Sequence, residues 1–194
     1  MNTKTSFKCI SHKCGETFDL NQIIYRCSRC DSLLEVSHNI NILKRRSSSS
    51  WMRLFDERYM KTSYPYGSGV WGKKEWVHPD IDIDNVVSLY EGGTNLFWAE
   101  RFGSDLGMSD LWIKQCGNSH TGSFKDLGMT VLISNVKQMI SAGVEIKAVI
   151  CASTGDTSAS LAAYCAAADI PTVVLLPKGH VSISQLIQPL SNGA

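Results

Sequence analysis

Short apolar runs alternate with helical patterns from Leu111 onward, and this alternation constrains the fold more than any other feature. An apolar run at Leu111–Ile113 precedes a loop, and apolar residues then recur at helical spacing from Leu127 to Met139, closed by Gly143. The same reading gives a strand at Ala148–Cys151, a helix at Thr157–Ala168, a strand at Thr172–Leu176 and a helix at Ser184–Leu190. Apolar strands joined by helices are typical of a parallel sheet buried on both faces. The sequence therefore predicts an α/β fold in the order βαβαβα. Because a helix C-cap at Asn192–Ala194 has no strand after it, we expect an N-terminal fragment of a longer protein.

Composition narrows the class of function. The 194 residues are 43% hydrophobic and 19% charged, which favours a folded chain over a disordered one. A formal charge of +1 offers no overall field for binding nucleic acid or an anionic membrane, so small-molecule chemistry is expected. The most apolar window, Ser158–Leu176, is broken by Asp169 and Pro171 and is not expected to span a bilayer. Since the N-terminus lacks an apolar or Arg-rich leader, a cytoplasmic location is expected.

Three segments follow one another along the chain. Residues 1–38 hold clustered cysteines and short apolar runs such as Ile23–Tyr25 and Leu33–Leu34, typical of a small module with strands. Residues 39–85 contain the basic run Lys44–Arg46 and the serines Ser47–Ser50, interpreted as a solvated linker, with a nucleic-acid patch as the minor alternative. A helix is predicted at Trp51–Met60 with Ser50 as its N-cap. Residues 86–194 hold the α/β pattern.

Four of the seven cysteines form two pairs that could bind a metal. Cys9 and Cys14 are separated by four residues, and Cys27 and Cys30 by two. Such pairs match a four-thiolate zinc site, although twelve residues between the pairs is shorter than is usual for a zinc ribbon. Four protein ligands leave no open position, so the zinc would be structural. The alternative is four reduced thiols in a small core.

One loop delivers a lysine to the start of a helix. Residues 119–126 read SHTGSFKD, and Lys125 precedes a helix that begins near Asp126. The helix dipole disfavours a cation there, so the position favours a neutral amine that can attack a carbonyl and form a Schiff base. The alternative is a surface lysine that extends outward into solvent.

A second loop, residues 151–158 with the sequence CASTGDTS, joins a predicted strand to the next helix. Its hydroxyl residues and glycine can cap the helix and also offer hydrogen-bond donors to a carboxylate or phosphate. It lacks the lysine of a phosphate-binding P-loop and is not a G-x-G-x-x-G fingerprint. A small anion therefore suits it better than a nucleotide, with a plain N-cap as the alternative.

The two loops together resemble the pyridoxal-phosphate enzymes of the tryptophan-synthase β fold, and most of all the plant-like branch of the threonine synthases. The resemblance rests on SFKD at 123–126 and ASTGDTSA at 152–159. It extends through YPYGSGVW at 64–71, EGGTNL at 91–96 and QLIQPL at 185–190, and so covers roughly residues 60–194.

The resemblance implies roles for individual residues. Lys125 is expected to bind pyridoxal 5'-phosphate covalently and to carry protons, and Phe124 to help seat the cofactor. The substrate carboxylate is expected at Ser153, Thr154, Gly155, Asp156 and Thr157. Asp156 also stands where an asparagine faces the cofactor's phenolic oxygen in much of the wider fold, and an aspartate there would need a proton or a donor. The residues that grip the cofactor phosphate and face its pyridine nitrogen are expected beyond residue 194.

The implied reaction converts O-phospho-L-homoserine and water to L-threonine and phosphate. Two alternatives remain at this point: a threonine or serine dehydratase with the same fold and lysine, and a non-catalytic zinc-ribbon protein that binds partners. The resemblance also implies an S-adenosylmethionine regulatory site that uses Pro65, Tyr66 and Gly67, for which a Gly-rich surface turn packed under Trp71 is the alternative. A homodimer is the expected assembly.

Overall fold

A three-stranded antiparallel sheet forms the N-terminal part of the computed structural model, which describes residues 5–59, 61–179 and 181–194. Its strands are β1 (Thr5–Cys9), β2 (Thr17–Phe18) and β3 (Leu34–His38), in the order β2-β1-β3. The run Ile23–Tyr25 lies outside these strands, contrary to its strand-like composition. Its side chains instead line a cavity of about 510 Å³ together with Leu132 and Met139 of a later helix, and Ile23 and Tyr25 stay exposed.

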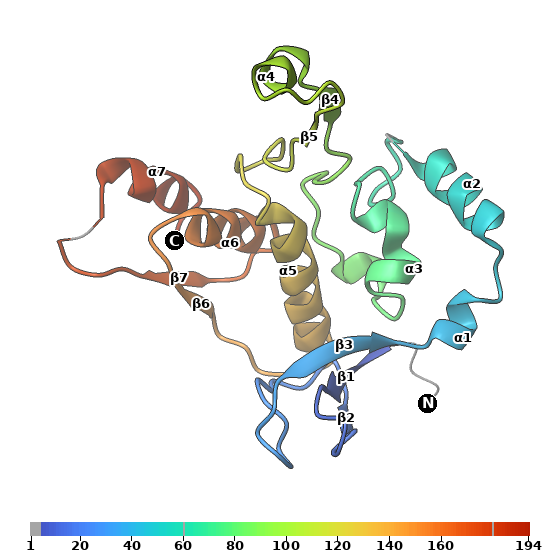
Figure 1. Cartoon of the computed structure of the whole chain (residues 1–194). Helices are drawn as coiled ribbons and strands as arrows, with labels where there is room; N and C mark the ends of the chain where they lie inside the picture. The colour runs from blue at the N-terminus through green and yellow to red at the C-terminus, as the bar shows by residue number, and fades with distance from the viewer. Residues whose placement is uncertain (1–4, 60, 180) are drawn as a thin grey trace.

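Short helices make up the middle of the chain, and Figure 1 shows them in cyan to green after β3. They are α1 (Ile40–Leu43), α2 (Ser48–Arg58), η1 (Trp71–Lys73), α3 (Lys74–Val77) and η2 (Ile83–Asn85). The predicted N-cap of α2 is wrong, because Ser47 rather than Ser50 takes that position and accepts the N–H of Ser50 at 3.3 Å. Ser48, Ser49 and Ser50 therefore form the first turn of a helix. The predicted last residue of this helix, Met60, lies outside the described residues.

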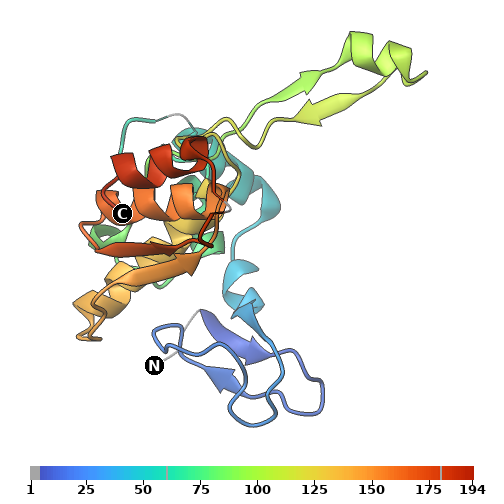
Figure 2. The ribbon, with the colours of Figure 1, turned by 90° about the vertical axis from the view of Figure 1, so that its left-hand side faces the viewer.

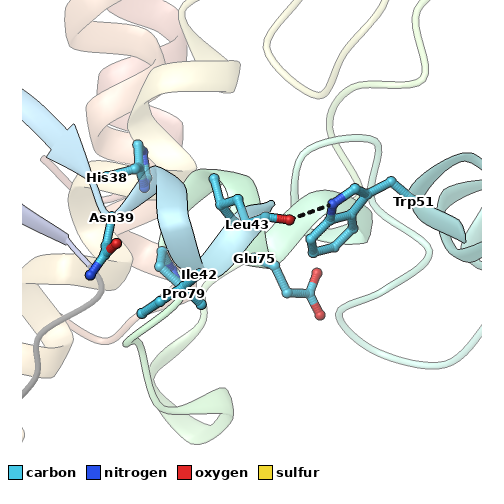
Figure 3. Close-up of a pocket in the computed structure, with 7 residues that line it drawn as sticks. All are labelled: His38, Asn39, Ile42, Leu43, Trp51, Glu75 and Pro79. Atoms are coloured by element: carbon cyan, nitrogen blue, oxygen red, sulfur yellow. Dashed lines mark hydrogen bonds between the residues drawn. The ribbon is translucent and has the colours of Figure 1, made fainter. Parts of the chain in front are cut away.

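The helices α1, α2 and α3 enclose a cavity of about 120 Å³. Figure 3 shows its lining, in which the indole N–H of Trp51 donates to the carbonyl oxygen of Leu43 at 3.2 Å. Glu75 of α3 closes one side and is held by two hydrogen bonds from Arg58, at 2.7 and 2.8 Å. These contacts fasten the middle helices to one another.

Two backbone segments touch through glycines, one segment just before η1 and the other just before the next strand. A Cβ added at Gly69 would lie 1.9 Å from the nitrogen of Gly93, and one at Gly92 would lie 2.8 Å from the Cα of Gly69. Gly92 also has φ +87°, a conformation that other residues rarely adopt. Close by, Trp71 is fully buried and its indole N–H donates to Thr130 at 2.7 Å. The loop before η1 is thus locked against the rest of the chain.

A hairpin arm projects from the body of the molecule, as Figure 2 shows. It consists of β4 (Leu96–Trp98), α4 (Glu100–Asp105) and β5 (Trp112–Lys114). The predicted strand at Leu111–Ile113 exists with a one-residue shift, but its placement in the parallel sheet is wrong: β5 pairs antiparallel with β4. An apolar run indicates a strand without naming its partner, and here a neighbouring strand lies close along the chain.

The C-terminal part is an α/β unit in which β6 (Val149–Ala152) and β7 (Thr172–Leu175) pair in parallel. Its helices are α5 (Asp126–Ser141), α6 (Asp156–Ala167) and α7 (Ile183–Ser191). The core joins α5 and α6 through Ile133, Leu161 and Tyr164. Burial on both faces of the sheet is not seen, because Ile150 and Leu175 are more than half exposed. No helix within the described ranges is long and apolar enough to span a membrane.

Candidate active site

Lys125 lies directly before the first residue of α5, where the sequence places it. Its side chain is half-buried and its Nζ lies 5.0 Å from the ring centroid of Phe124, which is 57% exposed. No carboxylate of the described residues forms an ion pair with it. The amine therefore has no carboxylate partner among these residues and faces the Phe124 ring.

The loop before Lys125 is braced by its own serine hydroxyls. Ser119 Oγ donates to the carbonyl of Ser123 at 2.8 Å, and Ser123 Oγ accepts the backbone N–H of Lys125 at 3.2 Å. Ser123 is buried, and Gly122 takes φ +78°, which permits the tight turn between them. The backbone at Lys125 is consequently fixed even though its side chain is not.

Asp126, the first residue of α5, is fully buried and accepts three hydrogen bonds. Its carboxylate receives the N–H of Thr121 at 2.9 Å, the hydroxyl of Thr121 at 2.6 Å and the hydroxyl of Ser160 at 2.6 Å. Ser160 belongs to α6, so the N-terminal ends of α5 and α6 lie side by side. Sequence reasoning treated Asp126 only as the start of a helix, although an acidic residue in a first helical turn was a usable signal.

The loop between β6 and α6 leaves hydrogen-bond donors free. Gly155 is the N-cap of α6, and no side chain of the described residues caps the helix. The predicted hydroxyl residues of this loop therefore do not act as the cap. Ser153 Oγ accepts the N–H of Gly155 at 3.3 Å. Within the described part of the chain the N–H groups of Asp156 and Thr157 have no acceptor. Free N–H groups at a helix N-terminus form a site for an anion.

The segment Pro65–Gly67 is packed against α2 and is not joined to the lysine loop by any hydrogen bond among the described residues. The Tyr66 ring lies under the guanidinium of Arg58, 4.2 Å from its centroid, and Pro65 is buried. A Cβ at Gly67 would lie 1.7 Å from the carbonyl oxygen of Lys61. This turn is thus part of the packing between α2 and η1.

Glu91, in the segment EGGTNL, is a buried carboxylate with four donors. Its side chain accepts hydrogen bonds from the hydroxyls of Ser68 (2.7 Å), Ser88 (2.9 Å) and Tyr164 (2.7 Å) and from the N–H of Leu89 (2.9 Å). Burial and the charge of Glu91 raise the pKa of Tyr164, so Tyr164 is the donor in this pair. The network ties two separate stretches of chain, at Ser68 and at Ser88–Glu91, to Tyr164 of α6.

The four clustered cysteines bring their sulfur atoms together. All four Sγ atoms lie within 4.8 Å of one another, with Cys9 and Cys30 3.4 Å apart and Cys14 and Cys27 3.7 Å apart. Zinc–sulfur bonds of about 2.3 Å in a tetrahedron place sulfurs about 3.8 Å apart, so the cluster has the right size. Hydrogen bonds from Ser32 lower the pKa of Cys30 to about 6, which favours a thiolate, the form that binds metal.

Comparisons with known proteins identify the family. The chain is 56% identical over 180 residues to threonine synthase 2, chloroplastic, of Arabidopsis thaliana, which covers 92% of this chain and 35% of that protein. It is 41% identical over 187 residues to a threonine synthase of Methanocaldococcus jannaschii, covering 96% of this chain and 41% of that protein. The chain thus spans between a third and about two-fifths of the length of these relatives. The family model for pyridoxal-phosphate dependent enzymes matches residues 87–194, more than half of the chain. The chain therefore belongs to the pyridoxal-phosphate dependent enzyme family.

Proposed function

We propose that this chain is part of a threonine synthase, a pyridoxal-phosphate-dependent lyase that converts O-phospho-L-homoserine and water to L-threonine and phosphate. The observation that carries the proposal is Lys125 at the start of α5, in a loop that the Asp126–Ser160 hydrogen bond joins to α6 and its free N–H groups, in a chain whose relatives bear that name. The same relatives give no support to the dehydratase alternative.

The residues present fit the cofactor. Lys125 offers an amine with no ion-pair partner in the described ranges, and the ring of Phe124 is exposed next to it. Covalently bound pyridoxal phosphate supplies an electron sink for negative charge at the α and β carbons of the substrate. Asp156 is exposed at the first turn of α6, and beside a phenolic oxygen its carboxylate would need a proton or a donor.

In this proposal, the loop before α6 binds the substrate and Lys125 transfers protons. The N–H groups of Asp156 and Thr157, with the hydroxyl of Thr154, bind the α-carboxylate and fix its orientation. Lys125 removes one proton from Cα and one from Cβ. Phosphate leaves Cγ, which takes up a proton and becomes the methyl group. The hydroxyl of water adds at Cβ, the other proton of that water goes to the departing phosphate, and a proton returns to Cα. One mobile amine serves all these transfers because it lies on a flexible side chain above a fixed backbone.

Lys125→Ala in the full-length protein tests this proposal. We expect loss of the visible absorbance band of the covalently bound cofactor and of phosphate release from O-phospho-L-homoserine. Lys137→Ala, on the same helix but bonded to the carbonyl of Asp84 at 3.0 Å, serves as control and should keep both. Near-normal threonine formation by Lys125→Ala would overturn the proposal.

We further propose that residues 1–38 form a zinc-ribbon-like module in which Cys9, Cys14, Cys27 and Cys30 bind structural zinc. The support is the size of the sulfur cluster and the burial of Cys9 and Cys27 in a module with little other core. In this proposal residues 39–85 link the module to the catalytic segment 86–194.

Three further expectations stay predictions. S-adenosylmethionine binding at Pro65, Tyr66 and Gly67 can be measured by titration calorimetry with Tyr66→Ala as the comparison. A homodimer can be tested by light scattering on purified protein. A cytoplasmic location can be tested by cell fractionation, which matters because the plant relative's name calls that protein chloroplastic.

A further inference from the structure

A continuous path of hydrogen bonds crosses the candidate site from α7 to α6. Gln188 Nε2 of α7 donates to the carbonyl oxygen of Thr121 at 3.3 Å. Thr121 donates twice to Asp126, and Ser160 of α6 donates to the same carboxylate oxygen as the Thr121 hydroxyl. The path therefore passes through the residue that follows Lys125 in the chain.

The strength of this path lies at its centre. Asp126 and Ser160 are both fully buried, so their 2.6 Å hydrogen bond is shielded from water. Hydrogen bonds to a carboxylate are shorter and about twice as strong as those between neutral groups. A buried carboxylate also depends on every donor it has, since losing one leaves an acceptor without a partner. The bond at Gln188 is exposed and weaker by comparison.

The position of the path matters for Lys125. Ser160 lies one helical turn beyond Asp156, at the end of α6 that bears the free N–H groups. Asp126 is adjacent to Lys125. The Asp126–Ser160 hydrogen bond therefore sets the distance between the backbone of Lys125 and the first turn of α6. The lysine side chain is flexible and does not fix this distance.

We propose that Asp126, held by Thr121 and Ser160, is a positioning residue that aligns Lys125 with the first turn of α6. The proposal rests on the proposed function, because it assigns Asp126 a part in the proton transfers of Lys125. A misplacement of the reacting group by about 1 Å can lower a rate by about a hundredfold. The clamp formed by Thr121, Asp126 and Ser160 therefore affects turnover. Substrate affinity, which the N–H groups of α6 provide, is untouched.

Ser160→Ala in the full-length protein is the primary test, because it removes one donor and adds no bulk. We expect kcat for threonine formation to fall roughly tenfold to a hundredfold with KM unchanged, while the cofactor band persists. Asp126→Asn is the second variant: it keeps the shape and places an amide donor opposite the Thr121 N–H, and the same pattern is expected. The matched control is Ser134→Ala, which removes another fully buried serine hydroxyl, bonded to the carbonyl of Thr130 at 2.6 Å.

The outcomes separate the two proposals. If the unmodified protein shows neither cofactor band nor turnover, the proposed function fails and the positioning role fails with it. If that protein is active but Ser160→Ala and Asp126→Asn keep the kcat of Ser134→Ala and lose only thermal stability, the clamp is purely structural and this inference alone is overturned. Should Asp126→Asn not fold, Ser160→Ala decides.

Discussion

Replacing Tyr164 by phenylalanine removes one hydroxyl from the buried network around Glu91. Tyr164 is fully buried and donates to Glu91 at 2.7 Å, so phenylalanine keeps the packing and deletes only the hydrogen bond. Hydrogen bonds to charged groups contribute about 1.5–3 kcal/mol. The Glu91 oxygen that loses Tyr164 still accepts the N–H of Leu89 at 2.9 Å, which places the expected loss in the lower half of that range.

We therefore expect Tyr164→Phe to lower the free energy of unfolding by about 1.5–2 kcal/mol, and Tm by roughly 3–8 °C. Urea denaturation followed by circular dichroism measures the first and calorimetry the second. Tyr64→Phe is the control, because the Tyr64 hydroxyl donates to the carbonyl of Val86 at 2.8 Å and accepts the N–H of Ser88 at 3.1 Å, but from a residue that is 47% exposed. Equal losses in the two variants would refute the reasoning that burial next to a carboxylate makes the Tyr164 bond stronger.

Three other predictions address pH, metal and substrate. Burial lowers the pKa of His78 below 6.5, and its Nδ1 is buried without a partner among the described residues, so the unfolded chain binds the extra proton more readily. The free energy of unfolding should fall between about pH 7.5 and 5.5, and His78→Gln should flatten that slope in urea titrations. Purified protein should carry about one zinc per chain by metal analysis, and Cys27→Ser with Cys30→Ser should lose it without losing the cofactor band; protein free of zinc under reducing conditions would leave only the thiol interpretation. Thr154→Val should lower kcat/KM by an amount that corresponds to a loss of about 1–3 kcal/mol of transition-state stabilisation. An unchanged kcat/KM would show that the Thr154 hydroxyl does not bind the substrate.

Periodic elements of the catalytic segment were predictable because their signal is local. The apolar spacing and the closing Gly143 define α5, which the structure places at Asp126–Ser141. The strand at Leu111–Ile113 was equally visible, but its partner was not. Pairing is decided by which strands meet in space, and the apolar residues of β4 indicate a strand without indicating its partner.

The polar network of the site was much less predictable. Glu91 meets Tyr164 across 73 residues of sequence, and Asp126 meets Ser160 across 34. No local pattern relates such partners, whereas the loops that contain them could be recognised by composition. The start of α2 shows a different limit: four consecutive serines offer four chemically equal N-caps, and only tertiary packing selects Ser47.

The contact between Gly69 and Gly92 has a consequence for sequence variation. Since a methyl group at either position would overlap the backbone of the other segment, a substitution at one site cannot be compensated by a second at the other. Random mutagenesis followed by selection for folded protein should therefore return glycine at both positions, even from libraries that vary the pair together. By contrast, Gly128 faces open space on α5 and has no positive φ, so it should accept alanine freely and gain helix stability. Gly69 and Gly128 look alike in the sequence, but they would differ in tolerance to substitution because a side chain at Gly69 would meet backbone and one at Gly128 would not.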